Sequence, residues 1–166
     1  MISIEFDLIW LPIIKVIFAM FLGGLMGLER ELAQKPAGLR THMLVAGASS
    51  LLVILGDVMI KHYGGSSFGQ VIRADPIRIM EAIITGISFL GAGTIIFRNR
   101  DETVEGLTTA ASILFAAAIG IAVALQRYFL AGILTVIAIV ILFGLGYIER
   151  FIRRLGKRLY DDNSNE

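Results

Sequence analysis

Five apolar runs, each close to the length that crosses a lipid bilayer, limit what this chain can fold into. In chain order they cover Leu8–Leu28, Thr41–Ile60, Ile77–Phe97, Gly106–Leu125 and Phe129–Ile148. A transmembrane helix needs about 20 predominantly apolar residues. Because 56% of the 166 residues are hydrophobic, one soluble core could not bury the apolar surface. We therefore predict an all-α membrane protein, a bundle of five transmembrane helices that uses the lipid bilayer as its solvent.

The lysines and arginines between the apolar runs divide unequally between the two sides of such a bundle. One side collects Arg30, Lys35, Arg40, Arg98, Arg100, Arg150, Arg153, Arg154, Lys157 and Arg158. The other side holds only Lys61, Arg73 and Arg127. The positive-inside rule then places the amino terminus outside and the carboxyl terminus in the cytoplasm. Because the charges form no continuous basic face, we expect no nucleic-acid partner.

The last segment, residues 149–166, alternates apolar and basic side chains and then turns acidic. This pattern is typical of a basic amphipathic helix that lies on anionic headgroups, followed here by a disordered tail. The expected organisation is a transmembrane domain over residues 1–148 and this short juxtamembrane segment.

Small residues recur at every fourth position of the first and fourth predicted helices. Such faces let two helix backbones approach closely in lipid. The faces meet either within one subunit or across a dimer, and from them we predict a homodimer. The glycines expected at helix contacts are Gly23, Gly27, Gly86, Gly91, Gly93 and Gly120.

Three ionisable residues, Lys15, Asp57 and Glu81, lie inside predicted spans. At 1.5 Å rise per residue, both carboxylates are expected about 5–6 Å below the outer interface, with Lys15 within reach. Charges in hydrocarbon are costly and mark pairs, cavities or sites. Three interpretations stay open: a structural ion pair, snorkelling side chains, or a proton or Mg²⁺ site at Asp57 and Glu81. Mg²⁺ is the one cofactor for which the sequence offers candidate ligands.

The third predicted helix opens with Asp75-Pro76. Aspartate is a favoured N-cap and proline suits the first helical position. Arg73 and Arg78 flank the Asp75 carboxylate and are expected to hold it, which adds Asp75 and Arg78 to Lys15 in an outer-side pairing group.

The segment between the first two helices carries Glu29, Arg30, Glu31, Arg40 and Thr41. These side chains form either a solvated loop or an ion-pair cluster against the other cytoplasmic turn, Arg98 to Glu105. At the start of the fourth helix, Glu105 is expected to lie in the first turn, where the helix dipole favours a carboxylate. Thr108 and Thr109 are expected to bond the glycines of the third helix.

Catalysis is not indicated. His42 and His62 are predicted on opposite sides of the membrane, His42 as an interfacial residue, and neither has a neighbouring nucleophile and carboxylate. Cysteine is absent, so disulfides and thiolate-bound metals are excluded. We expect a protein that is not an enzyme.

Five short segments resemble the membrane domain of the MgtC/SapB family. They are GLERE at Gly27–Glu31, KPAGLRTH at Lys35–His42, DPIRI at Asp75–Ile79, GISFLGAGTI at Gly86–Ile95 and VEGLTTAAS at Val104–Ser112. They occur in the family's order over roughly residues 10–125. By position, the family motif residues are Glu29, Arg30, Glu31, Pro36, Gly38, Arg40, Thr41, Asp75, Arg78, Gly86, Gly91, Gly93, Gly106, Thr108 and Thr109.

The resemblance implies a multi-pass protein of the bacterial inner membrane that is associated with growth under magnesium limitation and with virulence. Many relatives continue into a cytoplasmic ACT-like domain, whereas this chain stops after its short tail. Two function classes stay open. The first is Mg²⁺ transport or binding, and the alternative is a regulatory protein without transport that modulates a membrane partner such as the F-type ATP synthase.

Overall fold

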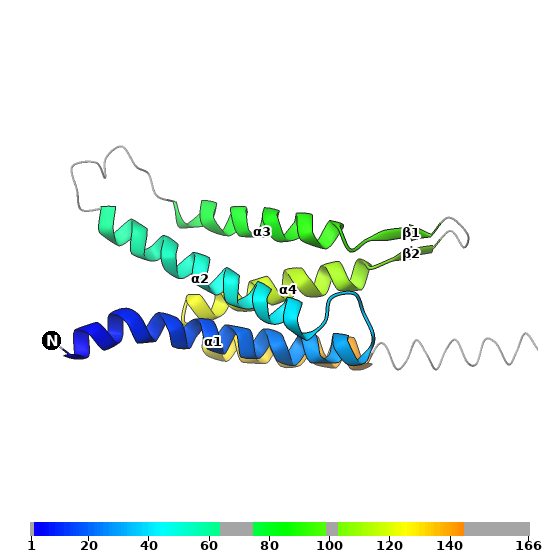
Figure 1. Ribbon diagram of the computed structural model, residues 1–166, viewed down its shortest axis with the longest axis horizontal. Helices are drawn as coiled ribbons and strands as arrows, with labels where there is room; N and C mark the ends of the chain where they lie inside the picture. The colour runs from blue at the N-terminus through cyan, green and yellow to red at the C-terminus, as the bar shows by residue number, and fades with distance from the viewer. Residues whose placement is uncertain (1, 64–74, 99–102, 145–166) are drawn as a thin grey trace, which may run out of the picture.

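The computed structural model describes residues 2–63, 75–98 and 103–144, and nearly all of them are helical (Figure 1). The helices are α1 (Ile2–Leu32), α2 (Leu39–Tyr63), α3 (Pro76–Ala92) and α4 (Leu107–Ala124). A fifth, Tyr128–Gly144, is called the C-terminal helix below. The all-helical prediction is confirmed. The end of the fifth predicted span and the whole 149–166 segment lie outside the described residues.

Three of the helices are long and apolar enough to cross a membrane. The qualifying segments are Trp10–Leu32, Leu39–His62 and Leu107–Ala124. Helix α3 has 17 residues, and the C-terminal helix is likewise apolar but shorter than these three. The membrane assignment is therefore supported, whereas the count of five spans and the orientation of the termini stay predictions.

The start of α3 and the ends of two other helices follow from local chemistry. Asp75 accepts a hydrogen bond of 2.9 Å from the Ile77 N–H, with proline next to it in the first turn, as predicted. Gln34 and Gln126 adopt the left-handed conformation, with φ of 53° and 62°, just after α1 and α4. Backbone bonds from Lys35 to Arg30 and from Arg127 to Ala122 complete the helix-ending pattern usually built on glycine.

A short β-hairpin separates α3 from α4, where the sequence predicted a helix reaching Phe97. Helix α3 ends at Ala92, and β1 (Ile96–Arg98) pairs antiparallel with β2 (Thr103–Glu105). β-Branched residues at 94–96 favour extended backbone over helix at this point. Gly106, with φ of 94°, then turns the chain into α4. Glu105 accordingly lies in β2 and not in the first turn of the helix.

The core lies between α1, α2 and α4, and Ala131 and Ala138 of the C-terminal helix also belong to it. Its fully buried members include Ala19 and Met26 from α1 and Ile113, Ile119 and Val123 from α4. Figure 1 shows α2 crossing this unit and α3 on its outer side. The C-terminal helix contacts α1 where the rings of Phe18 and Tyr128 meet edge to face, 6.0 Å between centroids.

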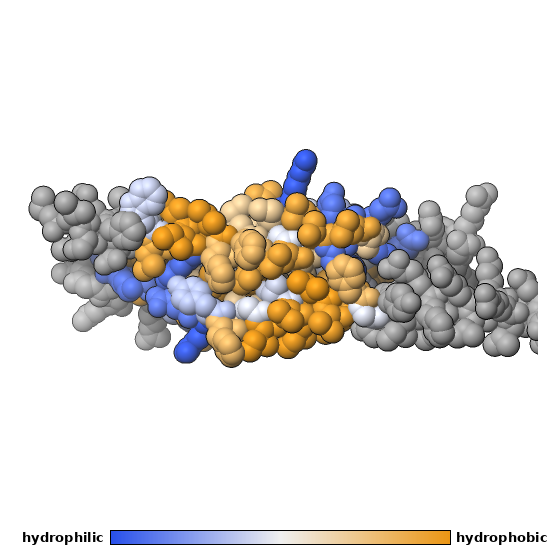
Figure 2. Space-filling view, turned by 90° about the horizontal axis from the view of Figure 1, so that it is seen from below, coloured by the Kyte–Doolittle hydropathy of each residue, from blue (hydrophilic) through white to orange (hydrophobic). Residues whose placement is uncertain are grey.

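Large apolar side chains cover the outside of the bundle. Ile17, Leu44 and Val140 are each about 60% exposed, which is unusual for a soluble protein and normal for a lipid-facing surface. Figure 2 shows the hydrophobic residues concentrated over the middle of one face.

The connections group at two ends of the bundle. The α1–α2 turn and the hairpin lie at one end, here named the hairpin end, and the amino-terminal end of α1 lies at the other, the opposite end (Figure 1). The α1–α2 turn and the α3–α4 turn, which are predicted on one side of the membrane, do lie at the same end of the bundle (Figure 1). Which side is cytoplasmic stays a prediction.

Candidate functional site

A cluster of buried polar side chains marks the hairpin end. It consists of Glu29 and Arg30 at the end of α1, His42 in α2 and Ser112 in α4, here named the His42 cluster. His42 is 0% exposed, and Glu29 and Arg30 are each 4% exposed. Polar groups buried this deeply need partners, because leaving them unpaired costs about 1–3 kcal/mol each, and more when charged.

Glu29 and Arg30 satisfy each other. The Arg30 guanidinium donates from Nε to Glu29 Oε2 at 2.5 Å and from Nη2 to Glu29 Oε1 at 3.0 Å. The side chains of residues adjacent in sequence normally point in different directions from a helix. This bidentate ion pair therefore requires both long side chains to turn toward each other. This segment therefore holds an ion pair within α1, whereas the predicted cluster against the turn from Arg98 to Glu105 stays a prediction.

His42 joins three elements. Its Nδ1 donates to the Gly38 carbonyl in the α1–α2 turn at 2.8 Å, and its Nε2 shares a 3.0 Å hydrogen bond with the Ser112 hydroxyl of α4. Ser112 also bonds the Thr109 carbonyl at 2.8 Å. Because a hydroxyl has one hydrogen, Ser112 donates to only one of these two acceptors at a time. His42 was expected at the interface and instead lies in the core.

Glycines let the helices close around this cluster. A Cβ on Gly27 would lie 2.8 Å from the His42 Cβ and 2.9 Å from the Gly38 carbonyl oxygen, and one on Gly23 would lie 2.5 Å from the His42 carbonyl oxygen. Gly120 of α4 packs on the Ala46 backbone from the other side. The small-residue faces of α1 and α4 therefore both serve packing within the subunit, against α2.

The remaining predicted residues at this end have other positions. The Glu31 carboxylate accepts a hydrogen bond of 3.1 Å from the Leu39 N–H and so caps the start of α2. Arg40 and Thr108 are exposed, and Thr41 is half-buried. Within the described part of the chain, neither Thr108 nor Thr109 bonds a glycine of α3.

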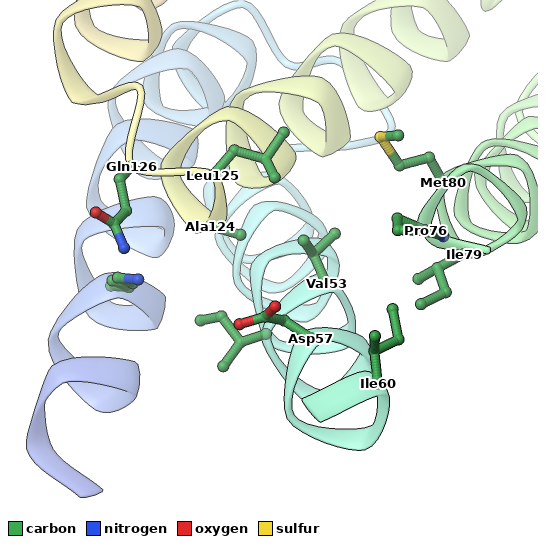
Figure 3. Close-up of a pocket in the computed structure, with 11 residues that line it drawn as sticks. Val53, Asp57, Ile60, Pro76, Ile79, Met80, Ala124, Leu125 and Gln126 are labelled. Carbon is green, nitrogen blue, oxygen red and sulfur yellow. The ribbon is translucent and has the colours of Figure 1, made fainter. Parts of the chain in front are cut away.

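At the opposite end a cavity of about 380 Å³ lies between α1, α2, α3 and the end of α4. Lys15, Asp57 and Gln126 supply its polar lining, and the apolar lining includes Ile54 and Met80. Figure 3 shows the Asp57 carboxylate turned into this space, with Pro76, Ile79 and Met80 of α3 forming one wall. Asp57 also forms an exposed ion pair with Lys61, one helical turn away. The Lys61 Nζ and Asp57 Oδ2 atoms are 2.7 Å apart.

The two carboxylates predicted to share a level are placed differently. Asp57 lines the cavity, whereas Glu81 is on the exposed side of α3 and is not among the lining residues. Among the residues that the structure describes, no three acidic or histidine side chains lie together as metal ligands would. The Asp57–Glu81 cation site stays a prediction. Asp75 bonds its own helix start, and the Arg78 side chain is exposed.

Ser112 was not predicted as a site residue, and His42 was predicted only as an interfacial residue. The sequence does hold a signal for these two polar residues. Ser112 follows Thr109 by three residues in an apolar helix, and His42 lies one turn before Ala46 in α2. What could not be read from the sequence was that α2 crosses between α1 and α4, bringing residues seventy positions apart into contact.

Comparison with known proteins gives one family. The model described as the MgtC family matches residues 16–151. A Haemophilus influenzae protein described only as uncharacterized is 40% identical over 144 residues, which is 87% of this chain and 59% of that protein. The putative magnesium transporter YhiD of Escherichia coli strain K12 is 39% identical over 118 residues, 70% of this chain and 52% of its own length.

A shorter relative, protein SrpB of Synechococcus elongatus, is 34% identical over 159 residues, 90% of this chain and 85% of its own length. The chain thus spans little more than half the length of the first two relatives. No solved structure matches.

Proposed function

This chain belongs to the MgtC family, and we propose that it acts in magnesium homeostasis as a regulatory membrane protein and not as a magnesium conduit. The magnesium role is supported by the family and by the name of the YhiD relative. Modulation of a membrane partner such as the F-type ATP synthase, which the family resemblance implies, stays a prediction.

The observation that carries the regulatory assignment is the packing at the hairpin end. Helices α1, α2 and α4 meet there so closely that Gly23 and Gly27 have no room for a side chain. The buried groups of the His42 cluster use their hydrogen bonds on one another and on the backbone carbonyls of Gly38 and Thr109. An ion that passed between these helices would have to break the Glu29–Arg30 pair or the His42–Ser112 bond, each buried and costly to open.

The cavity at the opposite end also fits a divalent cation poorly. Lys15 lines it, and a positive charge within a few ångströms opposes a second cation. Asp57, the one carboxylate among the described residues that line it, already has Lys61 as a counter-ion.

Transport remains the second candidate, on one observation. Mg²⁺ keeps several waters when it binds, and a cavity of about 380 Å³ beside a carboxylate has room for a hydrated ion.

Two measurements separate the candidates. Purified protein in liposomes that enclose a magnesium-sensitive dye is expected to show Mg²⁺ entry no faster than empty liposomes. In cells that lack the chain, growth at low magnesium is expected to be restored by the wild type and equally by Asp57→Asn/Glu81→Gln. Mg²⁺ entry that this double variant abolishes would contradict the regulatory assignment.

The magnesium role has its own test. If cells that lack the chain grow as well as wild-type cells at every magnesium concentration, the result would contradict that role. Size-exclusion and circular-dichroism profiles matching those of the wild type establish that the double variant is folded.

A further inference from the structure

Among the residues that the structure describes, helix α3 is packed on one face. Ile79 of α3 lies against Gly56 of α2, and Gly91 near its other end lies against Ala110 of α4. Ile83, midway between them, is 5% exposed. The helix therefore runs alongside α2 and α4 over its length, and we expect it to lie at the depth of the bilayer that those two helices are long enough to cross.

The face directly opposite Ile83 carries the polar residues of this helix. Arg78, Glu81, Thr85 and Ser88 are all exposed. At 100° per residue they fall into one stripe along the helix, turned away from the subunit. This stripe is here named the α3 polar stripe.

Such a stripe is unfavourable against lipid. Polar and charged side chains in membrane helices face other protein or water, because hydrocarbon offers them no hydrogen bonds. Neither Arg78 nor Glu81 forms an ion pair with another residue in the described part of the chain. In the described part of the single subunit, these two opposite charges therefore lie on the side of α3 turned away from the bundle without forming an ion pair.

The two charges are complementary to those of an identical helix. Arg78 and Glu81 are three residues apart, about 4.5 Å along the axis, which their long side chains can bridge. Two α3 helices related by a two-fold axis along the membrane normal run parallel, so Arg78 of each copy lies about 4.5 Å in depth from Glu81 of the other, and side chains that bridge this offset form both pairs at once.

We propose that the α3 polar stripe is the surface on which a second copy of this chain docks in the membrane. The small-residue faces of α1 and α4 are already filled by α2, so they are not available to a second copy in this fold. The stripe is free, charged and self-complementary, and it goes beyond the proposed function because it assigns the interface whatever the magnesium role is.

Cysteine cross-linking in native membranes tests the contact, because the chain has no cysteine of its own. Single variants Thr85→Cys and Ser88→Cys are expected to give an oxidation-dependent dimer. Val136→Cys, on the exposed side of the C-terminal helix, is the matched control and is expected to give none. Equal cross-linking at all three positions, no dimer at α3, or a cross-link to a different protein would each overturn the proposal.

Charge reversal tests the pairing. In a Ser88→Cys background, Arg78→Glu and Glu81→Arg are each expected to lower dimer formation roughly tenfold, because each places like charges together in both pairs. Co-expression of the two variants restores both pairs in a mixed dimer and is expected to restore cross-linking. Recovery in the mixture also shows that both variants fold. Loss in each variant without recovery in the mixture would contradict the Arg78–Glu81 pairing.

Discussion

Single buried residues decide how the helices of this bundle are held together. His42 has two ring nitrogens and uses both, one on the α1–α2 turn and one on α4. Glu29 and Arg30 neutralise each other at the end of α1 without help from another helix. His42 and Ser112 are therefore the connectors between helices, in a place where the apolar side chains alone would specify no unique register.

The Ser112 hydroxyl is the simplest connector to remove. Ser112→Ala leaves one nitrogen of His42 without its partner and is expected to lower the free energy of unfolding by about 1–3 kcal/mol. Thermal unfolding in detergent measures the change. Thr108→Ala, at an exposed hydroxyl of the same helix, is the control and is expected to stay within about 0.5 kcal/mol of the wild type.

The same contact predicts non-additivity. Adding Ser112→Ala to His42→Ala is expected to cost less than it costs alone, because the hydrogen bond is already lost. Additive effects of the two substitutions would show that the bond contributes nothing to stability.

At the scale of whole elements, contact between α1 and α2 depends on glycines, which have no side chain to hold the two helices apart. Gly23 and Gly27 lie on one face of α1, and each is in contact with the backbone or Cβ of α2 residues. In a membrane this closeness replaces the hydrophobic driving force that packs soluble helices. Helix α3 shows the contrary case, because a Cβ added at Gly86 would meet nothing within 4 Å among the described residues.

Gly27→Ala and Gly132→Ala form a matched pair that isolates this effect. The alanine at 27 would overlap the backbone of Gly38 and Leu39, so an overpacking cost of about 1–3 kcal/mol is expected. At 132, in the C-terminal helix, a Cβ meets nothing within 4 Å, and alanine is expected to be neutral or to stabilise by up to about 1 kcal/mol. Unfolding midpoints of the two variants compare them directly. Equal midpoints would show that α1 and α2 are not held at contact distance.

The whole molecule is a bundle with two chemically different ends. The hairpin end is closed by the His42 cluster, and the opposite end holds the cavity with Lys15 and Asp57. Apolar surface lies between them (Figure 2). Under the proposed regulatory function, this arrangement leaves partner contact to the surfaces of the bundle and gives its interior a structural role.

Orientation is the prediction that belongs to this scale. Lys35→Cys lies in the α1–α2 turn and Arg127→Cys in the turn after α4, both exposed. In intact cells stripped of their outer membrane, an impermeant maleimide is expected to label Arg127→Cys at once and Lys35→Cys only after the inner membrane is opened. Labelling of both before opening would contradict the transmembrane arrangement, and the reverse order would contradict the positive-inside assignment.

The sequence by itself determined the class of this protein, the approximate positions of its helices and the N-cap at Asp75, because these follow from hydropathy over about 20 residues and from local hydrogen bonding. The hairpin was not predicted, since Ile96 and Phe97 are as apolar as the helix before them. Only the tertiary structure decided that α2 passes between two glycine faces, that His42 reaches Ser112, and that Asp57 and Glu81 face different directions. Those outcomes depend on how helices rotate and cross, which hydropathy does not encode.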